Sequence, residues 1–269
     1  MLKSFLQIFS KPEIPVPEEK RPTLINRKAG LIPDYTPDPI DECFCGSEKY
    51  FKNCCGSREE KREEPYGVLI VPEFIDCETL KAICDFADQQ KGEPLQVIDE
   101  EKSTPGNIVK KVDKRRVSEL VQLKQFDKLI NDKVREAYLK YAPAFFKTDI
   151  EWYERPHLMR YQAGGYYQGH ADSENINPEL NAWEKVIDRD VSLLLYLNDA
   201  YEGGELFFNK FNYRLKPKAG MLVMFPSDHR YMHTAETVYE GIRYAVVSWA
   251  SAKGMEKVSA HPPDSKILL

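Results

Sequence analysis

The stretch Arg160–Asp172, RYQAGGYYQGHAD, constrains the fold more than any other part of the chain. It contains His170 and Asp172, which are separated by one residue. In an extended strand alternate side chains leave the same face, so the imidazole and the carboxylate can reach one point. Such a pair suits a divalent first-row metal, iron especially. A lone His-x-Asp pattern also occurs in ordinary surface pairs, so a metal site requires a third ligand.

A third ligand is available downstream, in the segment FPSDHRYMHTAETV. This segment contains His233, and Arg243 follows ten residues later. Two histidines and one carboxylate form the facial triad of non-haem Fe(II) oxygenases, which leaves positions open for a co-substrate and oxygen. A dicarboxylate such as 2-oxoglutarate would need a buried cation for its distal carboxylate, and a guanidinium binds carboxylates through two hydrogen bonds. The alternative for Arg243 is a structural ion pair with an acidic neighbour.

Five motifs follow one another along the chain: RYQAGGYYQGHAD, SLLLYLND, YEGGELFF, LKPKAGMLVMFPS and HTAETVYEGIRYAVVSW. Together they resemble the catalytic domain of 2-oxoglutarate/Fe(II) oxygenases, and in particular its prolyl-hydroxylase-like branch. The similarity extends over Val68–Lys253. It implies Fe(II), 2-oxoglutarate and O2, with ascorbate as a further reductant. It also implies hydroxylation of a C–H bond, most directly on a proline of a protein or peptide, with succinate and carbon dioxide as co-products.

The resemblance assigns roles to individual side chains. Three of them would bind the iron: His170, Asp172 and His233. Arg243 would bind the distal carboxylate of 2-oxoglutarate. His233 is preferred to His229 because its spacing to Arg243 matches the family, whereas His229 is expected on a connecting loop.

Two tyrosines match phenols that lie near the co-substrate in this family, Tyr196 and Tyr161. Either could instead be a core tyrosine with a satisfied hydroxyl. Tyr167 and Gly164 also fit the pattern, and we interpret them as a packing residue and a turn. His157 and His261 have no partners nearby in the sequence and are expected to be structural or exposed.

A second metal site is indicated by four of the six cysteines, which lie within thirteen residues: Cys43, Cys45, Cys54 and Cys55. The pattern resembles the SEC-C zinc motif, a module that often mediates interactions. Four thiolates close a tetrahedral zinc site without an open position, so the site would be structural. So short a segment cannot bury a core, and metal binding would supply most of its folding free energy. The alternative is a reduced, metal-free cluster; either reading favours a cytoplasmic protein over a disulfide-bonded one.

The chain divides into five parts: a Pro-rich arm (1–40), the zinc motif (41–57), a charged linker (58–66), the dioxygenase domain (67–253) and a C-terminal tail (254–269). Short strand-like segments separated by turns predict an α+β, mainly β fold, namely a double-stranded β-helix or jelly roll with backing helices. The strands are expected at 157–161, 191–197, 205–209, 221–225 and 242–250. Backing helices are expected from the N-cap Asp76 to about Gln89 and at 126–141, the second ended by Pro143.

The charge and hydropathy of the chain limit the classes of partner that we expect. The net charge of −5 argues against a nucleic-acid partner, no apolar run could span a membrane, and the first residues are too polar for a secretory signal. The basic cluster within Lys110–Arg116 is interpreted as a solvated loop. Residues 95–114 would form a hairpin or mobile loop that could close over a peptide. Two alternatives to a prolyl hydroxylase stay open: hydroxylation of another residue or a small molecule, and a zinc-knuckle adaptor with a non-catalytic barrel.

Overall fold

The computed structural model describes residues 23–24, 49–50, 53, 64–65, 67–98, 110–112 and 115–269. The four cysteines of the predicted zinc motif lie outside these residues, as does most of the Pro-rich arm. Of the arm, Thr23–Leu24 forms β1, which pairs in parallel with β12 (Ala182–Lys185). In the part of the chain that is described, no helix has the length and apolar character needed to cross a bilayer.

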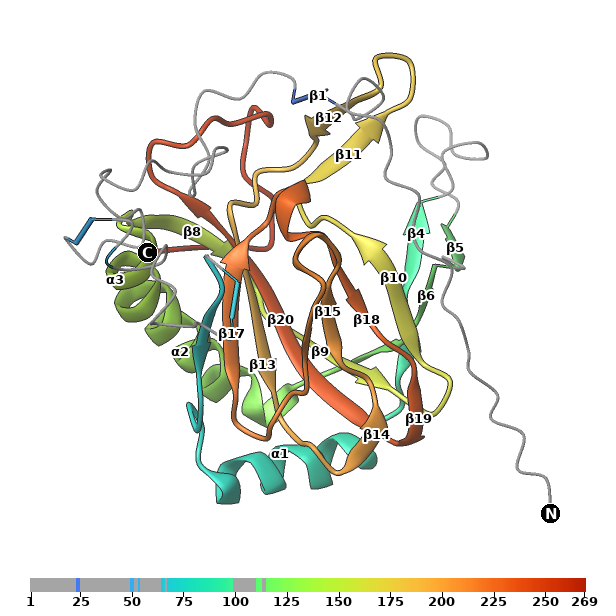
Figure 1. Cartoon of the computed structure of the whole chain (residues 1–269). Helices are drawn as coiled ribbons and strands as arrows, with labels where there is room; N and C mark the ends of the chain where they lie inside the picture. The colour runs from blue at the N-terminus through green and yellow to red at the C-terminus, as the bar shows by residue number, and fades with distance from the viewer. Residues whose placement is uncertain are drawn as a thin grey trace.

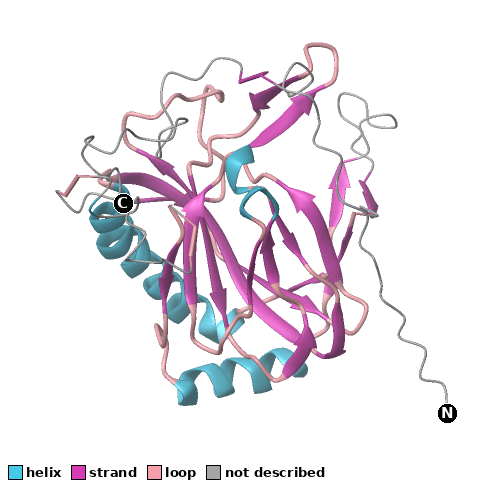
Figure 2. Ribbon diagram, in the orientation of Figure 1, coloured by secondary structure: helices cyan, strands magenta, loops and turns pink. Residues whose placement is uncertain are grey.

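Two facing sheets form a jelly roll (Figures 1 and 2). The larger sheet has nine strands: β2 (Leu69–Val71), β17 (Leu222–Pro226), β13 (Val191–Tyr196), β20 (Arg243–Ala252), β9 (His157–Tyr161), β7 (Glu119–Val121) and β3 (Glu93–Pro94) in spatial order, with β8 (Ile150–Glu154) and β21 (Lys266–Leu268) joined through β20. The smaller sheet has five, in the order β16 (Tyr213–Leu215), β15 (Leu206–Phe208), β18 (His233–Ala235), β10 (Tyr166–His170) and β6 (Arg116–Val117). The predicted fold class is confirmed.

The core lies between the two sheets. Phe208 of the smaller sheet and Phe225 of the larger one pack edge to face, with ring centroids 5.0 Å apart. All six residues of β13 are buried, because one face of the larger sheet meets the smaller sheet and the other meets helices. This two-sided burial holds the strands that carry the site rigidly.

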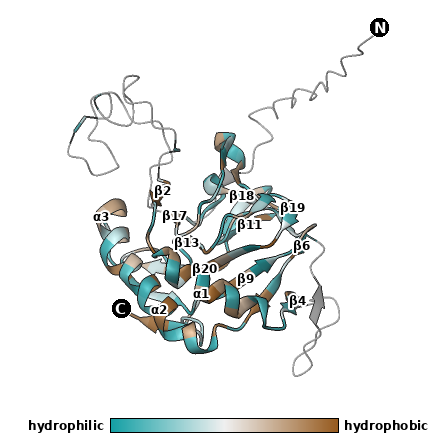
Figure 3. Cartoon of the chain, turned by 90° about the horizontal axis from the view of Figure 1, so that it is seen from below, coloured by the Kyte–Doolittle hydropathy of each residue, from teal (hydrophilic) through white to brown (hydrophobic). Residues whose placement is uncertain are grey.

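Helices cover the outer face of the larger sheet, as seen from below in Figure 3. Helix α1 (Cys77–Asp88) begins where predicted, because the Asp76 carboxylate accepts a hydrogen bond of 2.8 Å from the backbone N–H of Thr79. Its buried stripe is made by Leu80, Ile83 and Ala87. Helix α2 (Asp127–Glu136) buries Ile130 and Val134.

The expectation that Pro143 ends the second helix was wrong. After α2 the chain makes a π-helical turn, Ala137–Tyr141, and continues directly into α3 (Ala142–Phe146). Pro143 lies in the first turn of α3, directly after the π-helical turn, a position at which proline is tolerated. The helical segment ends instead at Lys147, whose backbone is left-handed with φ of 56°.

The five predicted strands correspond to β9, β13, β15, β17 and β20, with ends displaced by at most two residues. Smaller elements complete the fold: the antiparallel pairs β14 (Tyr201–Gly203) with β19 (Val238–Gly241), β4 (Gln96–Ile98) with β5 (Lys110–Val112), and β11 (Glu174–Asn177) with β12. The pair β4–β5 gives the predicted hairpin character to the described part of residues 95–114. The stretch predicted as a C-terminal tail supplies β21, which pairs with β8.

Candidate active site

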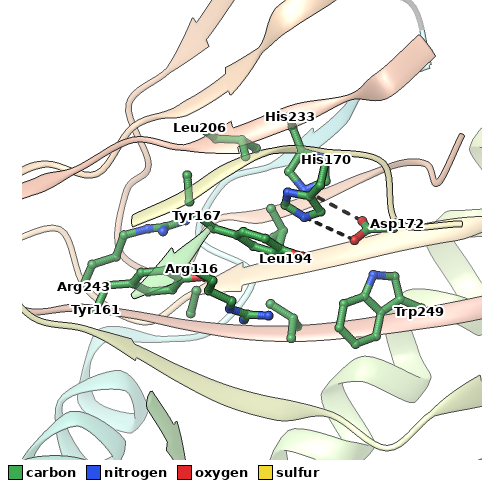
Figure 4. Close-up of a pocket in the computed structure, with 13 residues that line it drawn as sticks. Arg116, Tyr161, Tyr167, His170, Asp172, Leu194, Leu206, His233, Arg243 and Trp249 are labelled. Carbon is green, nitrogen blue, oxygen red and sulfur yellow. Dashed lines mark ion pairs between the residues drawn. The ribbon is translucent and has the colours of Figure 1, made fainter. Parts of the chain in front are cut away.

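Three predicted iron ligands converge at the mouth of the jelly roll. His170 lies at the end of β10, Asp172 follows it, and His233 begins the neighbouring strand β18. The Nε2 atoms of His170 and His233 lie 3.5 and 3.8 Å from the two carboxylate oxygens of Asp172. One ligand atom from each of the three falls within 4.8 Å of the others, close enough to share one ion (Figure 4).

The hydrogen bonds of the two histidines leave the correct nitrogen for metal binding. Nδ1 of His170 lies 2.9 Å from the carbonyl of Gln168, and Nδ1 of His233 lies 3.1 Å from the carbonyl of Tyr231. A carbonyl only accepts, so each Nδ1 carries the proton and each Nε2 presents a lone pair towards Asp172. Burial, with the nearby His170 as a further cause, lowers the pKa of His233 to about 4, so this imidazole is neutral at physiological pH.

Asp172 is held in place from behind. The Ser192 hydroxyl on β13 donates a hydrogen bond of 2.6 Å to its Oδ2, and Ser192 in turn lies 2.8 Å from the Ser227 hydroxyl. Despite burial, the pKa of Asp172 stays below its ordinary value, and the Ser192 hydrogen bond to the carboxylate is one cause. The carboxylate is therefore ionised and oriented, as a metal ligand must be. Ser192 is a supporting residue that the motif comparison did not identify.

Arg243, at the start of β20, is the second distinctive feature of the site. It is 2% exposed, and its Nε and Nη1 have no hydrogen-bond partner among the described residues. Within the described part of the chain its one hydrogen bond runs from Nη2 to the Tyr196 hydroxyl at 3.3 Å. Buried charged donors are normally paired, so this guanidinium is arranged for an anion supplied from outside the protein. The alternative of a structural ion pair is not found among the described residues.

Aromatic rings surround this guanidinium. Its central carbon lies 4.7 Å from the Tyr161 ring centroid and 5.1 Å from that of Tyr196, so both predicted tyrosines contact Arg243. Tyr201 is also close, since a Cβ at Gly204 would lie 3.1 Å from both the Tyr201 ring and Cδ of Arg243, and its buried hydroxyl has no hydrogen-bond partner among the described residues. Sequence comparison gave no role to Tyr201, whose motif carries no signal beyond a strand-entry turn.

The turn Gly203–Gly204 lets the backbone approach Arg243. Both residues have positive φ, and a Cβ at Gly204 would lie 3.1 Å from Cδ of Arg243. At Gly203 a Cβ would lie 2.2 Å from the Thr237 carbonyl oxygen, which excludes any side chain. The two glycines of this turn are required by both conformation and space.

A pocket of about 450 Å³ joins the metal ligands to Arg243. Arg243, Ala245, Val247 and Trp249 all line it from β20, as alternation along the strand predicts. Figure 4 shows Arg243 and Tyr161 at one end and Asp172 and Trp249 at the other. The remaining wall is largely apolar, with Leu194, Leu206 and Ala235. The pocket could hold a small dicarboxylate between a cation and a metal ion.

A larger open groove of about 1110 Å³ adjoins the same metal ligands on the side of Trp249. The Arg189 guanidinium stacks on Trp249 at 3.8 Å and makes a bidentate ion pair with Glu154 at 2.5 and 2.8 Å. His157 lines this groove, and burial lowers its pKa, so its assignment as structural or exposed understated its position. His261 is exposed, as expected.

Two residues at the junction of pocket and groove lie closer to the predicted metal ligands than the sequence analysis indicates. Tyr167 was interpreted as packing, but its ring stacks on His170 with centroids 3.6 Å apart. Arg116 was placed in a solvated basic loop, but it lies on β6 with its guanidinium carbon 4.5 Å from the Tyr167 ring centroid. Only the pairing of β6 with β10, which aligns Arg116 with Tyr167, brings this cation to the site.

The competing histidine, His229, lies on the loop between β17 and β18, as predicted. Its Nδ1 and its backbone N–H contact the same Glu174 oxygen, at 2.6 and 2.9 Å. Its ring stacks on Trp183 at 4.9 Å. His229 therefore anchors β11–β12 to the barrel and lies outside the cluster of His170, Asp172 and His233.

Comparison with known proteins agrees with this geometry. Residues 156–251 match the model of the 2OG-Fe(II) oxygenase superfamily. Human prolyl 3-hydroxylase 2 is 37% identical over 89 residues, which cover 30% of this chain and 13% of that protein. A PKHD-type hydroxylase from Thermosynechococcus vestitus is 34% identical over 99 residues, covering 35% of this chain and 42% of that protein. The chain thus spans less than half the length of these curated relatives.

Among solved structures, the fold resembles that of the viral collagen prolyl hydroxylase from Paramecium Bursaria Chlorella virus-1, with a TM-score of 0.50. The two are 16% identical, and the match covers 70% of this chain and 97% of the viral one. At this identity the likeness concerns the fold, and it supports the jelly-roll assignment.

Proposed function

We propose that this protein, whose residues 156–251 belong to the 2OG-Fe(II) oxygenase superfamily, is an Fe(II)- and 2-oxoglutarate-dependent dioxygenase that hydroxylates proline in a protein or peptide. One observation carries the dioxygenase part of the proposal. A pocket has three convergent metal ligands at one end and, at the other, a buried guanidinium with two unpartnered nitrogens. A catalytically inactive barrel would have no use for an unpaired buried cation, so the adaptor alternative is disfavoured.

The residues present fit both absent groups. The neutral Nε2 atoms of two histidines and the ionised Asp172 form the donor set that Fe(II) takes in such enzymes. When bound, iron and 2-oxoglutarate supply the oxygen activation and oxidation of the C–H bond. Arg243 would hold the distal carboxylate of the co-substrate, with the Tyr196 hydroxyl beside it. Burial raises the pKa of the Tyr196 hydroxyl, so it stays protonated and able to donate.

The other residues of the site orient the ligand side chains and exclude water from the pocket. Ser192 fixes the direction of the Asp172 carboxylate, and the Nδ1 hydrogen bonds fix both imidazole rings. Leu194, Leu206 and Ala235 keep the wall of the pocket apolar and so limit water around the reacting groups. The groove beside Trp249 leaves room for a substrate next to the metal position.

The choice of proline rests on the relatives, which are named as a prolyl 3-hydroxylase and a PKHD-type hydroxylase. We also propose that Cys43, Cys45, Cys54 and Cys55 bind one structural zinc ion, on the strength of their spacing, and that the module serves a partner protein. A cytoplasmic location remains a prediction from the same reduced cysteines. Ascorbate would act as an accessory reductant.

The deciding experiment is anaerobic reconstitution of the full chain with Fe(II) and 2-oxoglutarate, followed by oxygen and a panel of proline-containing peptides. We expect succinate formation that depends on both additions, and a gain of one oxygen atom on a proline, located by mass spectrometry. Succinate formation by the His233→Ala variant would refute the ligand assignment. Oxygen on another residue would preserve the dioxygenase and replace the substrate class.

A further inference from the structure

Arg116 occupies a special position in the molecule. It lines the pocket of the predicted metal ligands, the open groove beside Trp249, and a third cavity of about 610 Å³ between β3, β7 and β9. Its Nε donates a hydrogen bond of 2.8 Å to the Ser118 hydroxyl, and its guanidinium lies over Tyr167, which stacks on His170. In Figure 4 the Arg116 side chain lies between Tyr161 and Trp249. A half-buried cation is therefore held against the site.

The other charged groups around the groove have partners. Arg189 is paired with Glu154, Glu174 with His229, and Glu119 with Arg160. His157 carries little charge at neutral pH, because burial lowers its pKa. Arg116 has no carboxylate within ion-pair distance among the described residues, and the hydroxyl of Ser118 is uncharged. Among the described residues that line the groove, Arg116 is thus the arginine without a carboxylate partner.

The co-substrate does not need this charge. Fe(II), Arg243 and Asp172 together carry two positive charges, which the two carboxylates of 2-oxoglutarate neutralise. The positive charge of a second guanidinium beside them would not be neutralised by 2-oxoglutarate. An uncompensated cation at the rim of a low-dielectric site attracts an anion from the other ligand, the substrate.

Resting on the proposed function, we propose that Arg116 selects the substrate by binding a carboxylate next to the hydroxylated residue, so that the preferred substrate is an acidic peptide segment. The planar guanidinium, steadied by Ser118 and Tyr167, presents its two Nη groups for a bidentate carboxylate contact. A peptide fits better than a free amino acid, because the groove has more than twice the volume of the co-substrate pocket and Arg116 also faces the third cavity.

The test uses the full chain with Mn(II) and 2-oxoglutarate, without oxygen, and a library of peptides with a central proline. The positions flanking proline vary among Glu, Gln, Lys and Ala, and retained peptides are counted by mass spectrometry. We expect Glu peptides to exceed their Gln counterparts by about tenfold, as expected for one charge-assisted contact. With Fe(II) and oxygen, the same preference should appear in KM for the peptide.

Variants test whether the preference for Glu peptides depends on Arg116. Arg116→Glu should favour Lys peptides over Glu peptides, and Arg116→Gln should abolish the difference between Glu and Gln peptides. Arg115→Glu is the matched control, because Arg115 is exposed and adjacent; it should keep the preference for Glu. An unchanged preference in Arg116→Glu, equal retention of Glu and Gln peptides by the wild type, or retention of no peptide would overturn the proposal. So would a raised KM for 2-oxoglutarate in Arg116→Gln, which would assign Arg116 to the co-substrate.

Failure of this inference is distinguishable from failure of the proposed function. Peptide-independent succinate formation by the wild type with Fe(II) and 2-oxoglutarate reports on the iron pocket alone, and it should persist in Arg115→Glu. Its absence in the wild type would refute the dioxygenase. Its presence together with no acidic preference would refute only the role of Arg116.

Discussion

His170 and His233 are direct partners across the antiparallel pair β10–β18, although they lie far apart in the chain. Their ring centroids are 4.4 Å apart. The ladder between the two strands therefore sets the distance between the two imidazoles, and Asp172 meets both from the residue pair that follows β10. The ligand geometry depends on strand register, which a one-residue slip would destroy by turning one histidine to the opposite face.

Replacing a ligand should abolish iron binding without unfolding the protein. We expect His233→Ala to lose stoichiometric Fe(II) binding and succinate formation, because two remaining ligands do not complete the facial site. Iron content after dialysis and circular dichroism measure the two effects. His261→Ala, which alters an exposed histidine, is the control and should bind iron as the wild type does. Full iron occupancy in His233→Ala would point to a different ligand.

Ser192→Ala should weaken iron binding by about 10–100-fold, because a hydrogen bond to a metal-ligating side chain typically contributes this much. The substitution removes the 2.6 Å hydrogen bond to Oδ2 of Asp172 and leaves the ligand itself intact. Competition with a chelator measures the affinity. Ser248→Ala is a matched control in the same sheet, because the Ser248 hydroxyl binds the Glu154 carbonyl and not a ligand. Equal losses in both variants would indicate a general effect on the fold.

In the Arg243→Met variant, the free energy of unfolding should no longer depend on 2-oxoglutarate. Without ligand, the variant should be at least as stable as the wild type, because unpartnered buried donors carry a desolvation penalty of about 1–3 kcal/mol or more. With Mn(II) and 2-oxoglutarate at a hundred times its Kd, the wild type should gain about 2.7 kcal/mol of unfolding free energy and the variant nothing. Urea unfolding measures both quantities.

The control for this experiment is Arg214→Met, which removes an exposed guanidinium paired with Glu236. It should retain the full response to 2-oxoglutarate. A 2-oxoglutarate response in Arg243→Met equal to that of the wild type would show that the distal carboxylate binds elsewhere.

Cys77 and Cys84, about two helical turns apart in α1, should differ in reactivity. Burial raises the pKa of Cys84 to about 12, whereas Cys77 is exposed. At pH 9 we expect iodoacetamide to modify Cys77 quickly and Cys84 only after denaturation, as mapped by mass spectrometry. Since folded Cys84 holds its proton more tightly than the unfolded chain, the free energy of unfolding should fall as pH rises from about 9 towards 12. Equal labelling of both thiols in the native protein would contradict this burial.

One zinc ion per chain should be bound by the N-terminal cysteines, independently of iron. We expect Cys54→Ser to lose zinc while retaining iron, because the two sites share no ligands. Metal analysis of purified protein measures both ions. Zinc retained in Cys54→Ser would reject the four-thiolate site.

Much of the fold was predictable because its signals are local. The alternation in β20, the N-cap at Asp76 and the buried run of β13 each express a preference that neighbouring residues satisfy. The prediction for Pro143 was wrong because, in the sequence, a proline in the first turn of a following helix cannot be told from one that ends a helix. Tyr201, Ser192 and Arg116 were not identified, because nothing within their own segments distinguishes them from ordinary strand residues.

The sequence by itself determined the chemistry available: two imidazoles, a carboxylate and an arginine, at spacings that strands can bring together. The tertiary structure alone decided what supports and surrounds them, namely the Ser192 hydrogen bond to Asp172, the unpaired state of Arg243, and the position of Arg116 over Tyr167. The physical reason is that ligand identity belongs to individual side chains. Burial, pairing and the alignment of β6 with β10 are relations between distant segments, and they exist only once the sheets have formed.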